Sequence, residues 1–264
     1  MSQKHRFAQV TFLVALWMAL GWAFHLSTHA YQLVGIPLFV GFQLLVRKQP
    51  LITCWLREPG AVRFDLLTGV LTLVLLIVPV IRLLSVEGNE WIERGLLLAC
   101  SVGAVGAALA LRRFTPATVR HLLLCVATAG LPLCALILLQ ADVQFTATQA
   151  TALLEGFLLN LAAGFVIEEV AFRGVLDAHI HHAHDSQPWL SAIGLSLLWG
   201  WWHLPVRSGI PPIYNLVIFP LVALVPGVSF SIAWRRTGNL AVPAVVHALI
   251  NAVAYAFAVG IPPT

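Results

Sequence analysis

Long apolar stretches separated by short polar loops run through the whole chain. Several stretches reach the ~20 consecutive apolar residues with which a helix crosses a bilayer. They are continuous, whereas the strands of a membrane β-barrel alternate residue by residue. The pattern predicts an all-α polytopic membrane protein, a bundle of about nine (eight to nine) transmembrane helices. The predicted spans lie near residues 7–25, 30–46, 65–85, 95–111, 121–140, 150–180, 189–206, 212–233 and 240–260.

The composition agrees with this class. Hydrophobic residues make up 59% of the 264 residues and charged residues only 10%, whereas soluble domains carry about 25% charged residues. The basic residues are scattered in short loops, so the formal net charge of +4 does not indicate nucleic-acid binding. We expect the lipid bilayer to be the main surroundings of the protein. The four cysteines have no metal-type spacing and indicate no disulfide framework.

The loops on the two sides of the predicted bundle differ in charge. With nine crossings, one side carries eleven lysines and arginines and the other carries three. The first set is Lys4, Arg6, Arg47, Lys48, Arg57, Arg63, Arg112, Arg113, Arg120, Arg235 and Arg236, and the second is Arg82, Arg94 and Arg207. The positive-inside rule then places the N-terminus in the cytoplasm. We expect a multi-pass integral protein of a prokaryotic inner or plasma membrane.

The first five predicted spans carry little polar chemistry, so residues 1–149 are interpreted as scaffold helices. Ala99, Gly103 and Ala107 form a row of small residues that suits close helix packing. The segment 47–63 mixes charges with Trp55 and is predicted to lie along the inner membrane interface.

Three ionisable residues occur close together in the sixth apolar stretch: Glu168, Glu169 and Arg173. Each charge at bilayer depth costs roughly 3 kcal/mol on insertion scales, so the group must be paired, hydrated or used. No proline follows until Pro188. The pattern therefore predicts one helix of about thirty residues that continues to about residue 181, with Glu168 ~20 Å from its cytoplasmic end.

The helical spacing gives the two glutamates different neighbours. Glu169 and Arg173 are four residues apart and share a helix face, which predicts an ion pair. Glu168 points about 100° away and has no local cation, which suits a general base.

Later spans bring further polar side chains to a similar depth. His203 lies ~21 Å along the seventh span, and His247 and Asn251 lie ~10 and ~16 Å into the ninth. His247 and Asn251 are four residues apart, face one cavity and can donate hydrogen bonds to an oxyanion. We expect all these groups to meet in one polar cavity.

Together these motifs resemble the CAAX-protease and bacteriocin-processing (CPBP) family of intramembrane glutamic endopeptidases. The carriers of the resemblance are the Glu168-Glu169-x-x-x-Arg173 motif, an aromatic residue four before His203, and His247-x-x-x-Asn251. The family usually has phenylalanine four before that histidine, where this chain has Trp199. The resemblance covers roughly residues 150–255 and defines 150–260 as the predicted catalytic helical core.

The resemblance implies a reaction and a role for each residue. Glu168 and His203 would activate a water, His247 and Asn251 would stabilise the oxyanion, and Glu169 and Arg173 would support the site. The reaction would be peptide-bond hydrolysis in a membrane-tethered peptide or protein, without a cofactor. Prenylated substrates and substrates with a leader or sorting signal all remain open.

Further aromatic and polar residues lie near these motifs. Phe172, Trp199 and Trp202 are predicted to line the substrate cleft, and Asn160 and Tyr255 either line the cavity or pack. A histidine-rich tract is interpreted as a solvated helix end, with metal binding or pH sensing as the alternatives. The tract comprises His179, His181, His182, His184 and Asp185.

Three other functions remain open from the sequence. Glu168, His203 and His247 are also a possible zinc ligand set, although the sequence has no HExxH motif. Intramembrane Glu, Arg and His residues also occur in proton-coupled transporters, although no internal repeat supports that plan. A non-catalytic membrane scaffold or immunity factor is the third alternative.

Overall fold

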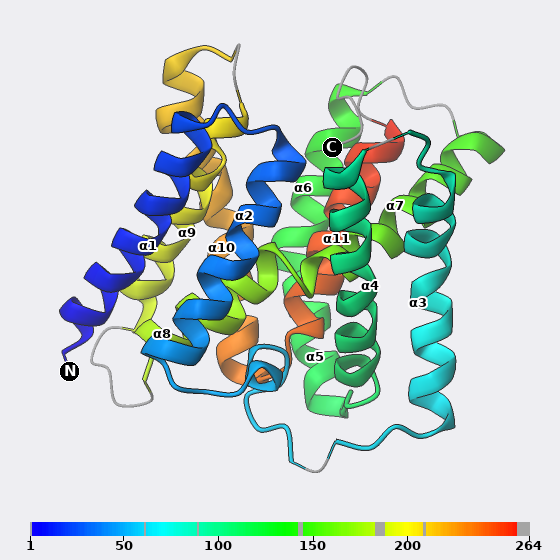
Figure 1. The fold of residues 1–264 in the computed structure, drawn as a ribbon, viewed down its shortest axis with the longest axis horizontal. Coiled ribbons are helices and arrows are strands. Elements are labelled where there is room, and N and C mark those ends of the chain that lie inside the picture. Colours follow the sequence, from blue (N-terminus) through cyan, green and yellow to red (C-terminus); the bar gives the residue numbers. More distant parts are fainter. Residues whose placement is uncertain are drawn as a thin grey trace.

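The computed structural model describes residues 2–60, 62–88, 90–141, 145–182, 188–207 and 210–257. These residues are largely helical and form no β-strand, only an isolated antiparallel bridge between Leu56 and Asn239. The helices pack side by side into a bundle (Figure 1). The protein is therefore an all-α polytopic membrane protein, as predicted.

The α-helices begin and end close to the predicted spans. In chain order they are α1 (Gln3–Ala23), α2 (Thr28–Gly41), α3 (Leu66–Ser85), α4 (Trp91–Leu111), α5 (Pro116–Cys125), α6 (Leu131–Gln140), α7 (Ala147–Gly164), α8 (Ala178–Ile180), α9 (Pro188–Trp202), α10 (Phe219–Thr237) and α11 (Ala241–Phe257). Four π-helical segments extend or join them, namely η1 (Phe42–Val46), η3 (Val126–Gly130), η4 (Val170–Asp177) and η6 (Tyr214–Ile218), and two short 3₁₀ turns are η2 (Leu51–Cys54) and η5 (Leu204–Val206).

Within the described residues, six helical stretches are long and apolar enough to cross a membrane. They are Gln3–Ala23, Thr28–Val46, Leu66–Ser85, Trp91–Leu111, Pro116–Gln140 and Tyr214–Thr237. Helix α11 is a shorter apolar helix of 17 residues, and α9 has 15 residues. These stretches support a multi-pass integral membrane protein, and the count of nine crossings stays a prediction.

The stretch at 150–180, predicted to be one helix, is interrupted. Helix α7 ends at Gly164, a turn follows, and helical structure resumes at Glu168. The indole Nε1 of Trp55 donates a hydrogen bond of 2.8 Å to the carbonyl of Phe165 in this turn. The prediction of one continuous helix was wrong. The apolar pattern favoured continuation, but the Trp55 side chain, from another part of the chain, supplies a hydrogen-bond donor to the backbone of the turn.

Part of the segment around Trp55 packs into the bundle, and its predicted position along the membrane interface stays a prediction. Leu56 is only 4% exposed. The backbone N–H of Leu240 donates to the carbonyl of Trp55, and Arg57 N–H donates to the carbonyl of Gly238. The segment therefore joins the turn before Glu168 to the chain that leads into α11.

The predicted row of small residues on α4 does permit a close helix contact. A Cβ atom at Gly103 would lie 2.0 Å from the carbonyl oxygen of Ala162 on α7. Ala107, one turn further, is fully buried. Only glycine allows the two backbones to approach this closely, and the contact sets α7 against α4.

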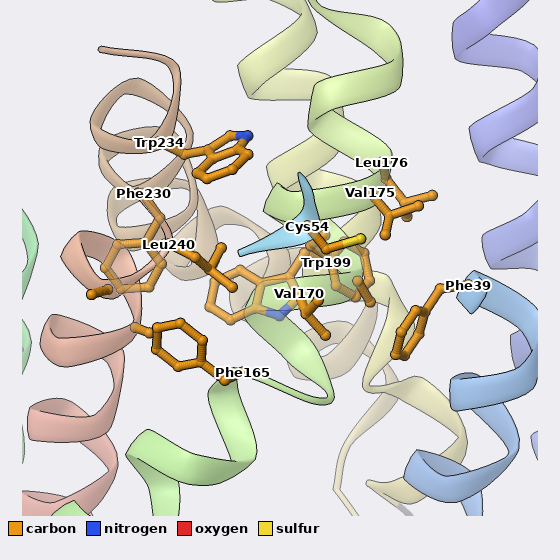
Figure 2. Close-up of a cluster of buried hydrophobic side chains, with 14 of the residues drawn as sticks. Phe39, Cys54, Phe165, Val170, Val175, Leu176, Trp199, Phe230, Trp234 and Leu240 are labelled. Atoms are coloured by element: carbon orange, nitrogen blue, oxygen red, sulfur yellow. The ribbon is translucent and has the colours of Figure 1, made fainter. Parts of the chain in front are cut away.

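A buried apolar cluster surrounds the start of the polar site. Figure 2 shows Cys54 of η2 close to Val170 and Trp199, with Phe165 at the end of α7 and Phe230 and Trp234 projecting from α10. All six side chains are buried. The helices that carry the predicted catalytic residues thus share one core with η2.

Candidate active site

Two adjacent carboxylates stand at the first turn of the helical segment that continues into η4. The side chain of Glu169 is fully buried, whereas that of Glu168 keeps 16% of its surface exposed. Segment η4 is π-helical, a geometry that is frequent at functional sites. The two adjacent carboxylates therefore differ in exposure, with Glu169 closed off and part of Glu168 open.

Glu169 is held by two partners through one oxygen. Its Oε1 accepts a hydrogen bond of 3.2 Å from Nη1 of Arg173 and one of 2.8 Å from Nδ1 of His247. The Arg173 guanidinium also lies 4.5 Å from the ring centroid of Trp199 and 5.2 Å from that of Phe230. The predicted Glu169–Arg173 pair is confirmed, and the bond to His247 adds a link to α11.

Glu168 faces a different set of groups. Its Oε2 accepts a hydrogen bond of 3.0 Å from Nε1 of Trp199 and lies 3.7 Å from Nε2 of His203. Among the described residues, the hydrogen bond from Trp199 uses Oε2 alone and leaves Oε1 open. One carboxylate oxygen is therefore fixed, and the other is left for a water or substrate.

His203 follows directly after the last residue of α9, and its ring orientation is defined by the backbone. Nδ1 is 2.8 Å from the carbonyl oxygen of Trp199. A carbonyl only accepts hydrogen bonds, so Nδ1 carries a proton and donates it. Nε2 is then the ring nitrogen that faces Glu168.

His247 and Asn251 lie on α11, one helical turn apart. Nδ1 of His247 is engaged by Glu169, which leaves Nε2 for another partner. Nδ2 of Asn251 donates a hydrogen bond of 3.2 Å to Oδ1 of Asn160, and Asn160 in turn donates to the carbonyl of Gly156. Asn160 therefore orients Asn251. From the sequence alone it was open whether Asn160 lines the cavity or packs.

The other predicted cleft residues are part of the core. Phe172 and Trp202 are 0% and 1% exposed and pack on Trp17, at ring-centroid distances of 6.5 and 5.0 Å. The carbonyl of Trp202 accepts a hydrogen bond from the Tyr31 hydroxyl. In this conformation both are packing residues rather than surface residues of a cleft, and contact with a substrate stays a prediction for them.

The histidine-rich tract divides where α8 ends. His179 is buried, with its Nε2 2.9 Å from Oε1 of Gln9. Burial, followed by the positive charges of Arg47 and Arg6, lowers the pKa of the His179 imidazole to about 4. The prediction of a solvated helix end is therefore wrong for His179, while His182 is exposed. His184 and Asp185 lie outside the described residues.

The described part of the chain contains no group of three His, Cys, Asp or Glu side chains placed to hold a metal ion. The zinc set of Glu168, His203 and His247 is therefore not preformed as such a group. Zinc dependence stays a prediction that only experiment can test.

The fold and this site define a polytopic helical membrane protein with a Glu-Glu-Arg-His-His-Asn constellation, in which Glu169 and Arg173 are buried and the other four side chains are partly buried. Residues 149–253 match a family model described as Type II CAAX prenyl endopeptidase Rce1-like. This match supports the resemblance of residues 149–253 to the CAAX protease (CPBP) family that the sequence motifs indicated. No curated protein and no solved structure matched the chain.

Proposed function

We propose that this protein is an intramembrane endopeptidase in which Glu168 and His203 activate a water molecule. One observation carries the proposal: Oε2 of Glu168 and Nε2 of His203 face each other at 3.7 Å, too far for a direct hydrogen bond. With Nδ1 protonated, Nε2 of a neutral ring is an acceptor, as is the carboxylate. A water could donate one hydrogen bond to Nε2 of His203 and the other to Oε1 of Glu168, the carboxylate oxygen that Trp199 leaves open.

Such a water is suited to attack a carbonyl carbon. Glu168 takes its proton as the new C–O bond forms, and the same carboxyl group returns that proton to the leaving amine as the C–N bond breaks. The products are a carboxylic acid and an amine, so the step balances with no metal or other cofactor.

His247 and Asn251 are suited to stabilise the oxyanion of the tetrahedral intermediate. Glu169 accepts from Nδ1 of His247 and supplies the counter-charge for a doubly protonated ring, whose Nε2–H could then donate to the oxyanion. Asn251 uses one N–H on Asn160 and keeps its second N–H for the substrate. Glu169 and Arg173 act here as support.

We propose a membrane-tethered peptide or protein as the substrate. The description of the matched family favours a prenylated C-terminus as the first class to test. Substrates with a leader or sorting signal are the second class. We further propose that the N-terminus is cytoplasmic, as the loop charges favour, and that the substrate reaches Glu168 from the cytoplasmic face or laterally from lipid.

The test is cleavage of a panel of membrane-tethered peptides, prenylated and not, by purified protein in nanodiscs. Wild type, Glu168→Gln and Glu169→Gln are compared with and without a strong zinc chelator. We expect Glu168→Gln to lose at least 10²-fold in kcat, the scale of general-base catalysis, while Glu169→Gln keeps measurable cleavage and the chelator has no effect.

Two results would contradict this mechanism. Full activity in Glu168→Gln would remove Glu168 as the base. Loss of activity on chelation that zinc restores would make the protein a metalloprotease, with His203 and His247 as ligands. Substrate-dependent proton flux in liposomes, without cleavage, would instead support a transporter.

A further inference from the structure

Trp199 occupies an unusual place in the candidate active site. It is 6% exposed, and its indole Nε1–H makes the one hydrogen bond that the described residues donate to Glu168. Its backbone carbonyl accepts from Nδ1 of His203. The same residue therefore determines the orientation of both groups that face the proposed water.

The ring of Trp199 also contacts the supporting residues. Its centroid lies 5.4 Å from the His247 ring and 4.5 Å from the guanidinium carbon of Arg173. One side chain thus touches the Glu168 side and the Glu169 side of the site. Phenylalanine at this position could keep the ring contacts and the backbone carbonyl, but it has no N–H for Glu168.

We infer that Trp199 is a positioning residue that holds Oε2 of Glu168 in place and favours its ionised form, so that Oε1 and the gap to His203 accept the reacting water. This inference rests on the proposed function for its kinetic consequence. The hydrogen bond itself can be measured without any cleavage. The indole N–H thus has a positioning role that differs from the predicted role of Trp199 in lining a substrate cleft.

Two variants separate this role from general packing. Trp199→Phe removes the N–H and keeps an aromatic ring. Trp201→Phe is the matched control, because the indole N–H of Trp201 donates to the carbonyl of Leu216 and not to Glu168. If Trp199→Phe does not fold, Trp199→Met takes its place, because methionine also lacks a hydrogen-bond donor.

The first measurement is the pH dependence of cleavage. A hydrogen bond to a charged group favours that charged form, so its loss makes ionisation of Glu168 harder. We expect kcat of Trp199→Phe to fall roughly tenfold. The acidic limb of its pH–rate profile should move about one pH unit upward. KM should stay within about twofold, because interactions that bind the substrate and the transition state equally are unaffected. Trp201→Phe should keep the wild-type profile.

The second measurement is the infrared carboxyl band of Glu168 during a pH titration, assigned by its loss in Glu168→Gln. A shift of this titration in Trp199→Phe that is absent in Trp201→Phe supports the hydrogen bond between Trp199 and Glu168. This result would stand even if the wild-type protein cleaves no substrate, and in that case only the proposed function fails. Identical titrations and identical pH profiles in the two tryptophan variants would overturn the inference.

Discussion

At the scale of residues, the two neighbouring carboxylates have separate partners. Glu169 contacts Arg173 and His247, while Glu168 contacts Trp199 and approaches His203. The spacing of four residues was enough to predict the Glu169–Arg173 pair. The contacts of Glu169 with His247 and of Glu168 with Trp199 could not be predicted in the same way, because they depend on how separate helices are rotated against one another.

The buried ion pair makes Arg173 a sensitive position. In Arg173→Met, Glu169 would stay fully buried with His247 as its remaining partner. Breaking a buried pair by removing one partner costs about 3–5 kcal/mol, so we expect a marked loss of stability in thermal unfolding in detergent.

The matched control for this prediction is Arg82→Met. Arg82 pairs with Glu155, and both side chains are about one-third exposed, at 38% and 32%. A solvent-accessible pair contributes less than about 1 kcal/mol. Equal losses of stability in the two variants would contradict the structural role that we assign to Arg173.

At the scale of elements, the segment that carries Glu168, Glu169 and Arg173 is held at both ends. Trp55 binds the turn that precedes it. At its other end, Arg47 donates to the carbonyl of Ala178 and Arg6 donates to that of Ile180, and cations are favourable at a helix C-terminus. Gly174 lets η2 approach, because a Cβ there would lie 2.3 Å from the carbonyl oxygen of Cys54.

Most elements could be predicted from the apolar pattern, and the interruption at Phe165 could not. The residues around it suit a helix, and its cause is a side chain 110 positions earlier in the chain. The helix contact of Gly103 was predictable, because small residues four apart allow close packing whatever their partner.

Substitution of Trp55 tests the importance of that turn. Trp55→Phe leaves the carbonyl of Phe165, a fully buried residue, without its donor. An unpaired buried polar group costs about 1–3 kcal/mol, so we expect lower thermal stability and reduced cleavage. Trp91→Phe, at a side chain that is 69% exposed, is the control. Indistinguishable behaviour of the two variants would rule out a role for Trp55 in holding the turn.

At the scale of the whole molecule, the bundle separates the loops onto two faces. Figure 1 shows the start of α1 and the α2–α3 and α4–α5 connections at one end, and the α1–α2 and α3–α4 connections at the other. The first end carries most of the loop arginines and lysines. This arrangement supports the proposed cytoplasmic N-terminus.

Labelling of single introduced cysteines tests that orientation. Lys48 and Glu87 are exposed and lie in connections at opposite ends of the bundle. The four native cysteines are buried, so they should contribute little background. In intact cells, we expect a membrane-impermeant maleimide to label Glu87→Cys and to spare Lys48→Cys, and inverted vesicles should give the opposite result. Labelling of Lys48→Cys in intact cells would reverse the topology.

The strand-like contact of residues 55–57 with 238–240 has a consequence for how such a protein can be inherited. The stretch 150–257 holds the candidate catalytic residues, yet its backbone completes hydrogen bonds with residues 55–57, which lie about a hundred residues before that stretch begins. A buried backbone group that loses its partner is costly, so we expect that stretch to be destabilised if it moved alone into a new gene. A fusion that keeps the motifs must also carry η2 and Trp55, so the N-terminal helices constrain where recombination is tolerated.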